Sequence, residues 1–211
     1  MKKEESLEEV KNEIKNCKLC GLYINRNKTV PGEGNPRADI FFIGEGPGKN
    51  EDIEGRPFVG AAGKFLDECL NIIKLSRKDV FIGNVIKCRP PMNRDPKEDE
   101  INTCQNYLFR QIKIIKPKLI VTLGRFSLSL FIPGETISKV HGKLKEVRFK
   151  KLSHPLHELG AIYVLPLYHP AAALYRGNMR EMIIDDFRNI PKITKKINNK
   201  SLLGLGVKSR A

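Results

Sequence analysis

The chain has 211 residues, 40% of them hydrophobic, and its 38 Lys and Arg against 24 Asp and Glu give a formal net charge of +14 at pH 7. This length excludes a large multidomain protein. The apolar content excludes a fully disordered chain, because burial of apolar side chains can offset the conformational entropy lost on folding. The charge favours a polyanionic partner, either nucleic acid or an anionic membrane, over a merely solvated Lys-rich surface. No apolar run approaches the roughly 20 residues of a spanning helix, which disfavours membrane insertion and secretion.

Apolar patterning predicts alternating helices and strands along the first half of the chain. Leu7, Val10 and Ile14 recur at helical spacing and predict a short helix that leads into Cys17. Residues 39–43 predict a buried strand that ends at a glycine-rich turn, residues 44–48. A helical stripe over residues 61–73 and a second strand over residues 80–86 follow.

The second half continues the same alternation. Residues 101–115 predict a helix that Pro117 ends, residues 119–123 a third strand, and the segment from Gly124 another helix. A basic, hairpin-like stretch over residues 137–157 precedes the fourth strand at residues 161–167, and a long helix spans about residues 178–197. Apolar strands separated by helices predict an α/β fold with a parallel sheet covered on both faces. We expect one domain, residues 1–198, and a loose basic tail, residues 199–211.

Five cysteines, an odd number, favour metal ligation plus one spare thiol over a disulfide framework. Cys17 and Cys20 are separated by two residues, Cys88 follows the second strand, and Cys104 lies on the next helix, so the four can converge. Four thiolates suit zinc or an iron–sulfur cluster equally, and four unconnected buried thiols are the alternative. Cys69 falls among apolar helix positions and is expected to be a core thiol.

Three strand ends bring polar groups to one edge of the predicted sheet, where ligands bind in parallel α/β folds. The turn at residues 44–48 is a weak match to a dinucleotide loop, because that fingerprint needs glycine where Lys49 stands. It nevertheless exposes backbone N–H groups, and Glu45, Glu51 and Asp52 place acidic groups around it. These carboxylates are expected to serve the site, the alternative being a solvated loop.

Asn84 lies within an apolar strand, where its amide needs partners. A side-chain amide offers a donor beside an acceptor, which matches the O4 acceptor and N3–H donor of uracil, whereas cytosine presents the reverse pattern. The alternative is an Asn that caps a turn. Of the four histidines, His169 alone directly follows a strand and is the expected catalytic one, whereas His141, His154 and His157 lie in the preceding loop.

Together these motifs resemble the iron–sulfur uracil-DNA glycosylases of family 4. The resemblance extends from residue 17 to about residue 187 and includes the four-cysteine spacing. The other matching pieces are Gly44-Glu-Gly-Pro-Gly48 with Glu51-Asp52, Gly55-x-Pro57-Phe58-Val59-Gly60-x-Ala62-Gly63, Asn84-x-x-Lys-Cys88-Arg-Pro-Pro-x-Asn93-Arg94, and His169-Pro-Ala171.

The resemblance implies a three-layer α/β/α sandwich with a four-stranded parallel sheet, a structural 4Fe–4S cluster, and hydrolysis of the N-glycosidic bond of uracil in single- and double-stranded DNA. It implies a monomeric DNA-repair enzyme of the prokaryotic cytoplasm, associated with the nucleoid. The carried-over roles are cluster ligation by the four cysteines, base stacking by Phe58, base reading by Asn84, donation to O2 of the base by His169, and backbone contacts from Gly44 and Gly46. Because the base must leave the stack, we expect Leu174 as a wedge and Arg176 and Arg180 on nearby phosphates.

One departure from the wider superfamily concerns the glycine turn. The best-known uracil-DNA glycosylases carry a water-orienting aspartate where this chain has Gly46, and an aromatic that excludes thymine where it has Gly48. We expect Glu45 to orient water, Glu51 to restrict the space beside C5 of the base, and Asn93 to order the pocket loop. Residues 89–103 lack the histidine with which related proteins crosslink to abasic DNA, so ordinary hydrolytic turnover is expected.

Two other functions remain open at this point. One is a noncatalytic iron–sulfur DNA-binding module, which the joint presence of Asn84, Phe58 and His169 disfavours. The other is a broader glycosylase of the neighbouring family, also acting on hypoxanthine or ethenocytosine, which Glu45 and Asn84 disfavour. A membrane-surface role lacks a strongly amphipathic basic helix with aromatic anchors.

Overall fold

A mixed six-stranded sheet forms the centre of the computed structural model, which describes residues 5–149, 151, 154–175 and 177–204. The strands are β1 (Glu33–Gly34), β2 (Ile40–Gly44), β3 (Phe81–Asn84), β4 (Leu119–Leu123), β5 (Lys145–Arg148) and β6 (Ala161–Leu167), in the order β1-β3-β2-β4-β6-β5. The predicted α/β fold and four parallel strands are confirmed, since β3, β2, β4 and β6 pair in parallel. Antiparallel β1 and β5 extend the sheet at its two edges.

Burial explains why the sequence predicted the parallel strands and did not predict the edge strands. Every residue of β2, β3 and β4 is buried, which is typical of strands covered on both faces. β1 has only two residues, and β5 alternates between half-buried and exposed positions. These edge strands therefore carry too few apolar residues to stand out from the surrounding loops.

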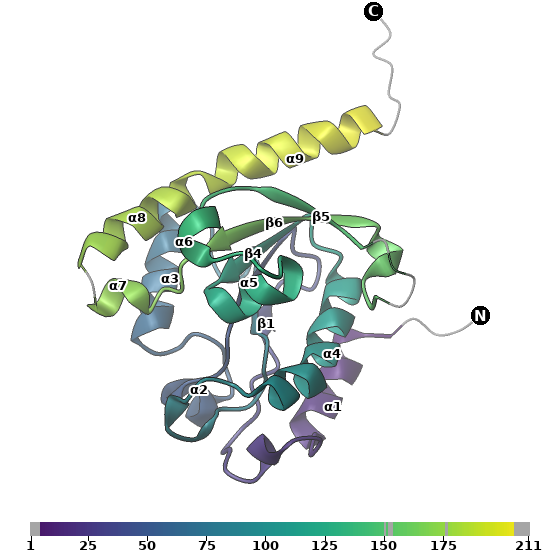
Figure 1. Ribbon diagram of the computed structural model, residues 1–211, viewed down its shortest axis with the longest axis vertical. Helices are drawn as coiled ribbons and strands as arrows, with labels where there is room; N and C mark the ends of the chain where they lie inside the picture. The colour runs from purple at the N-terminus through teal and green to yellow at the C-terminus, as the bar shows by residue number, and fades with distance from the viewer. Residues whose placement is uncertain (1–4, 150, 152–153, 176, 205–211) are drawn as a thin grey trace, which may run out of the picture.

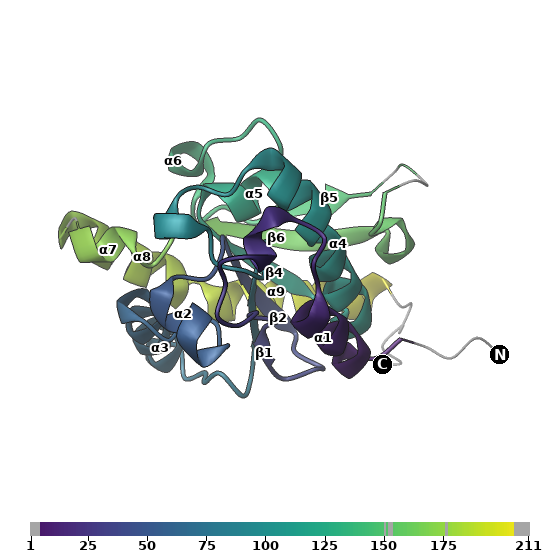
Figure 2. The same ribbon diagram turned by 90° about the horizontal axis from the view of Figure 1, so that it is seen from below.

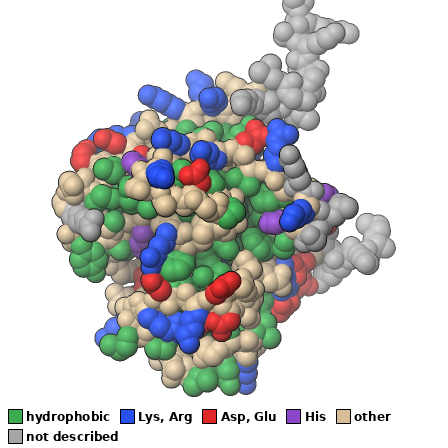
Figure 3. Space-filling model, in the orientation of Figure 1, with side chains coloured by type: hydrophobic (Ala, Val, Ile, Leu, Met, Phe, Trp, Pro, Cys, Tyr) green, Lys and Arg blue, Asp and Glu red, His purple; other side chains and the backbone are tan. Residues whose placement is uncertain are grey.

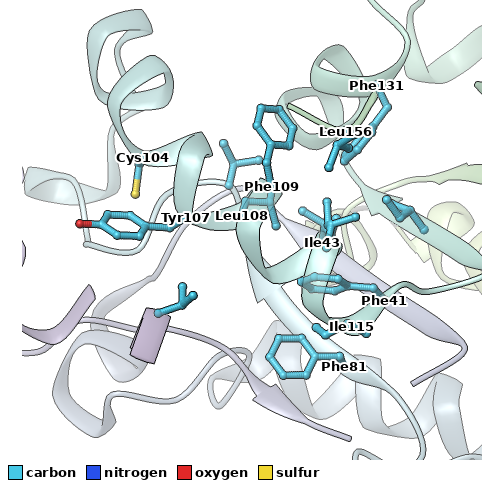
Figure 4. Close-up of a cluster of buried hydrophobic side chains, with 14 of the residues drawn as sticks. Phe41, Ile43, Phe81, Cys104, Tyr107, Leu108, Phe109, Ile115, Phe131 and Leu156 are labelled. Atoms are coloured by element: carbon cyan, nitrogen blue, oxygen red, sulfur yellow. The ribbon is translucent and has the colours of Figure 1, made fainter. Parts of the chain in front are cut away.

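Helices cover both faces of the sheet (Figures 1 and 2). On one face, α1 (Leu7–Asn16), α4 (Glu98–Ile115) and α5 (Arg125–Phe131) enclose a core cluster. Figure 4 shows Cys104 and Tyr107 at one end of this cluster, apart from Phe41 and Phe81. On the other face, α3 (Ala61–Ile72), α8 (Gly177–Arg188) and α9 (Ile190–Gly204) enclose a second cluster, in which Phe42 stacks on Phe187 at 5.7 Å.

The carboxyl-terminal helix differs from its predicted form. The single helix expected over about residues 178–197 is two helices, α8 and α9, with Asn189 between them. Pro191 accounts for the break, because it has no N–H to donate and its ring crowds the carbonyl four residues earlier. Residues 199–204, expected in a loose tail, continue α9, and residues 205–211 lie outside the described residues.

Short elements connect the layers and position the loops at the strand ends. They are η1 (Gly21–Tyr23), α2 (Lys49–Glu54), η2 (Pro91–Asn93), α6 (Ile137–Val140), η3 (His157–Leu159) and α7 (Ala172–Tyr175). Within the described part of the chain, none of the helices has the length and apolarity needed to cross a membrane.

Candidate active site and cysteine site

A pocket of about 250 Å³ opens at the carboxyl ends of the parallel strands. It brings together the turn after β2, the last residue of β3 and the segment after β6, as the strand order requires. Seven of the predicted site residues line it: Glu45, Gly46, Glu51, Phe58, Asn84, Asn93 and His169. The remaining lining residues are Pro47, Gly48, Ala62, Pro90, Arg94 and Ala171.

Asn84 presents an unused acceptor in this pocket. Its side chain is 2% exposed, and its Oδ1 has no hydrogen-bond partner among the described residues. Gly44 allows the arrangement, because a Cβ there would lie 2.4 Å from Asn84 Oδ1 and 2.6 Å from Phe58 Cζ. A buried acceptor without a partner costs about 1–3 kcal/mol, so Asn84 is prepared for a ligand that donates a hydrogen bond.

Asn84 is also connected to the interior of the protein. The Lys87 ammonium group, 1% exposed, donates to the backbone carbonyl of Asn84 and to Gln111 Oε1, each at 2.8 Å. The Lys87 backbone N–H donates to Cys104 Sγ at 3.2 Å. Lys87 therefore links the base of the pocket to the cysteine site described below.

His169 is held as a neutral imidazole. The backbone N–H of Ala171 donates to its Nδ1 at 3.1 Å, so Nε2 carries the ring proton. Burial lowers the pKa of His169 to about 4, while the Glu51 carboxylate opposes that shift. Gly124 approaches from the end of β4, since a Cβ there would meet His169 Cβ at 3.2 Å. At neutral pH the ring is therefore an uncharged N–H donor.

Phe58 forms a rigid wall beside this histidine. Its ring is 5% exposed and stacks on the His169 ring, with centroids 5.6 Å apart and an interplanar angle of 27°. The backbone of Phe58 has φ of 53°, a left-handed conformation that residues with a Cβ rarely adopt. The surrounding structure must hold such a conformation in place.

Glu51 ties the Phe58 loop to the glycine turn. Its Oε1 accepts from the backbone N–H groups of Val59 and Gly60, each at 2.9 Å, and its Oε2 accepts from Gly48 N–H at 3.1 Å. A Cβ at Gly48 would lie 2.8 Å from Glu51 Oε2, so any side chain at this position would require the carboxylate to shift. The carboxylate thus belongs to the pocket wall, with both oxygens already engaged.

Glu45 has the least constrained carboxylate in the pocket. The residue is half-buried, and its backbone carbonyl accepts from Ile86 N–H at 3.1 Å, whereas its carboxylate has no hydrogen-bond partner among the described residues. Burial raises the pKa of Glu45, and the nearby Asp95 raises it further, while Arg125 opposes both. This carboxylate is therefore free to contact a water molecule or a developing positive charge.

The loop at η2 forms the outer rim. Met92 and Asn93 both have φ of 54°, and Arg89 Nε donates to Asn93 Oδ1 at 2.7 Å. Arg94 donates to Glu100 Oε1 and Oε2 at 2.6 and 2.9 Å. It lines the pocket but was not among the predicted site residues, although its position in the motif that begins at Asn84 could have indicated this role. Met92 is 92% exposed.

The two described residues among the predicted DNA contacts, Leu174 and Arg180, lie on α7 and α8. Leu174 on α7 is 44% exposed, and the adjacent Tyr175, which was not predicted, is 85% exposed. Arg180 on α8 is 45% exposed; its Nη2 pairs with Glu68 at 2.5 Å, and its guanidinium lies over the Phe65 ring. Arg176 lies outside the described residues. Figure 3 shows Lys and Arg side chains scattered among acidic ones on the visible face.

The other histidines lie outside the lining of this pocket. His141 Nδ1 bonds with Asp186 Oδ2 at 2.9 Å, and His154 stacks on Phe149 at 4.5 Å. His157 begins η3.

The four predicted cysteine ligands line a second, apolar pocket beside α1 and α4. Arg26 donates to Cys88 Sγ at 3.1 Å, and Cys104 accepts the Lys87 N–H described above. Among the described residues, no three Cys, His, Asp or Glu side chains lie close enough to hold a single metal ion. A cluster takes one cysteine at each iron, so its ligands stand further apart than those of one ion, and N–H···S donors commonly accompany such sites. The donor set fits an iron–sulfur cluster.

Cys69 is separate from this group. It is fully buried on α3 within the second core cluster, and burial raises the pKa of its thiol to about 12. The sequence predicted a core thiol at this position.

Comparison with known proteins places these features in a family. The model of the uracil DNA glycosylase superfamily matches residues 31–190. The type-4 uracil-DNA glycosylase of Sulfurisphaera tokodaii is 51% identical over 195 residues, covering 90% of this chain and 85% of the relative. Type-4 uracil-DNA glycosylases of Saccharolobus solfataricus and Archaeoglobus fulgidus are 48% and 46% identical, over 88% and 91% of this chain and 85% and 95% of the relatives.

Proposed function

The chain belongs to the uracil DNA glycosylase superfamily, and from this membership we infer that it excises uracil from DNA as a step of base excision repair. It hydrolyses the N-glycosidic bond between uracil and deoxyribose and leaves an abasic site. Type-4 uracil-DNA glycosylases that are 46% to 51% identical support this activity. The observation that carries the mechanism is the buried, unpaired Oδ1 of Asn84 in a pocket shared with Phe58 and His169.

Asn84 selects uracil by hydrogen bonding. Its Oδ1 accepts from N3–H of the base and its Nδ2 donates to O4, while the Phe58 ring stacks on the base. Cytosine presents an acceptor and a donor in the opposite order, which would leave both amide groups unpaired. Leaving a buried polar group unpaired costs about 1–3 kcal/mol, or a factor of roughly 5 to 150 in discrimination.

His169 assists departure of the base. As the bond breaks, negative charge grows on O2 of uracil, and the Nε2–H group donates to that oxygen. A neutral imidazole suits this task because Ala171 fixes the tautomer before the substrate arrives. The donor therefore needs no reorientation during the reaction.

Glu45 acts on the sugar side. The deoxyribose becomes an oxocarbenium-like cation, and the half-buried, unpartnered carboxylate stabilises it and orients the attacking water. Gly44 and Gly46 bring the turn close enough for backbone contacts with the nucleotide, Glu51 narrows the space beside C5 of the base, and Asn93 orders the rim.

The substrate is everted from single- or double-stranded DNA, with Leu174 filling the space that the base leaves. Arg176 and Arg180 contact neighbouring phosphates; Arg180 binds Glu68 through Nη2 alone, which leaves other guanidinium donors for a phosphate. The enzyme acts as a monomer in the cytoplasm of a prokaryote, associated with the nucleoid.

We propose that a 4Fe–4S cluster would be held by Cys17, Cys20, Cys88 and Cys104. When bound, it would supply structural cross-linking between the segment after α1, the segment after β3, and α4. Iron analysis and the visible spectrum of the purified protein test this. Cys104→Ala is expected to remove iron and colour, whereas Cys69→Ala, which changes another buried helical thiol, keeps both. A colourless protein that contains zinc would contradict the assignment.

Single-turnover excision of an end-labelled uracil oligonucleotide, followed by alkali cleavage, tests the activity. We expect cleavage at uracil by the wild type and at least a tenfold slower rate for Asn84→Leu and His169→Ser. Asn71→Leu, the same change on the exposed face of α3, serves as the control and keeps the wild-type rate. Binding without cleavage would favour a noncatalytic module. Equal excision of hypoxanthine or ethenocytosine would favour a broader glycosylase.

A further inference from the structure

The loop that carries Phe58 is held from two sides. Glu51 binds the N–H groups of Val59 and Gly60, as described above. On the opposite side, Arg77 binds the carbonyl groups: its Nη1 donates to Pro57 O at 2.8 Å, and its Nη2 donates to Phe58 O. The backbone on both sides of the Phe58 side chain is thus fixed by charged groups.

Arg77 is itself oriented by two carboxylates. Its Nε donates to Asp67 Oδ1 at 2.6 Å, and its Nη1 also donates to Glu33 Oε1 at 2.8 Å. The Arg77 side chain is 19% exposed, so water competes little for these bonds. A planar guanidinium has enough donors for all four partners, whereas a lysine ammonium has three and lacks the planar geometry.

The Phe58 carbonyl is enclosed by α3 as well. A Cβ at Gly63 would lie 1.7 Å from Phe58 O, so the helix backbone passes directly beside that oxygen. In the left-handed turn at Phe58, the carbonyl oxygen therefore accepts a hydrogen bond from Arg77. The absence of a side chain at Gly63 leaves room for that oxygen.

We propose that Arg77 is a positioning residue for uracil excision, which fixes the left-handed turn at Phe58 and so seats the Phe58 ring beside His169 and Asn84. This proposal rests on the base-stacking role proposed for Phe58. Arg77 does not line the pocket, and it acts on the base through Phe58. Without the two carbonyl contacts, the loop relaxes toward ordinary backbone angles and the ring leaves its position.

A double-mutant cycle separates this role from a general effect on stability. Arg77→Gln is expected to lower kcat/KM for a uracil oligonucleotide at least tenfold, with unchanged circular dichroism. In a Phe58→Leu background the same substitution is expected to change kcat/KM less than twofold, because no ring remains to be positioned. An equal tenfold loss in both backgrounds, or a loss below twofold in the wild-type background, would overturn the proposal.

Arg56→Gln is the matched control. Arg56 also binds Glu33, at 2.7 Å, but it is 55% exposed and contacts neither carbonyl, so this variant keeps wild-type kcat/KM. If Arg77→Gln does not fold, Arg77→Lys replaces it in the cycle and is expected to show the same dependence on Phe58. Full activity of Arg77→Lys would refute the requirement for a guanidinium. Failure of the proposed activity is recognised separately, because the wild type would then leave uracil in place.

Discussion

Acidification is expected to destabilise the folded protein through His169. In the unfolded chain this histidine takes up a proton near its ordinary pKa of 6.5, whereas burial lowers the pKa to about 4 in the folded state. Between these values the unfolded state binds more protons, so the free energy of unfolding falls as the pH drops from 6.5 to 4. At 1.36 kcal/mol for each pKa unit, the expected loss is about 3 kcal/mol.

Urea unfolding of the wild type and of His169→Gln at pH 7 and pH 4 measures this contribution. Other groups titrate equally in both proteins, so the wild type should lose about 3 kcal/mol more than the variant over this interval. Burial of the ring explains the direction of this pKa shift, and protonation at Nδ1 would also break the hydrogen bond that the ring accepts from Ala171 N–H. Equal losses in the two proteins would show that the ring charges as readily in the folded state as in the unfolded chain.

Three further predictions concern the pocket and its surroundings. Since burial raises the pKa of Glu45, the single-turnover excision rate should fall on acidification before His169 protonates, and Glu45→Gln should give a slower rate with that dependence removed. Gly63→Ala should lower the free energy of unfolding by more than about 1 kcal/mol in urea, although Ala ordinarily stabilises helices, because its Cβ would collide with the Phe58 carbonyl. Leu174→Ala should slow excision from duplex DNA about tenfold while single-stranded DNA is processed at the wild-type rate, since only the duplex needs a wedge; equal slowing would contradict this.

The sequence predicted the parallel strands and most of the pocket because both follow from local pattern. Apolar runs such as residues 119–123 mark buried strands, and parallel strands deliver their carboxyl ends to one edge. Asn84 and His169 were therefore identifiable by their positions at strand ends. Pro191 was visible too, but the apolar period continued through it and concealed the break between α8 and α9.

Features that depend on long-range packing could not be predicted in this way. The left-handed backbone at Phe58 has no local signal, and the guanidinium that binds its carbonyl belongs to Arg77, 19 residues away along the chain. The pairing of Arg180 with Glu68 joins positions 112 residues apart, so no local pattern indicated this ion pair. In each case the deciding partner belongs to another element of the fold.

The buried ammonium of Lys87 holds residues 84–88 together. Asn84, at one end of this segment, lines the pocket, and Cys88, at the other end, belongs to the cysteine site. The Lys87 side chain folds back and donates a hydrogen bond to the backbone carbonyl of Asn84. We therefore expect that loss of the proposed cluster would disturb Asn84 through this short segment and lower the proposed discrimination between uracil and cytosine.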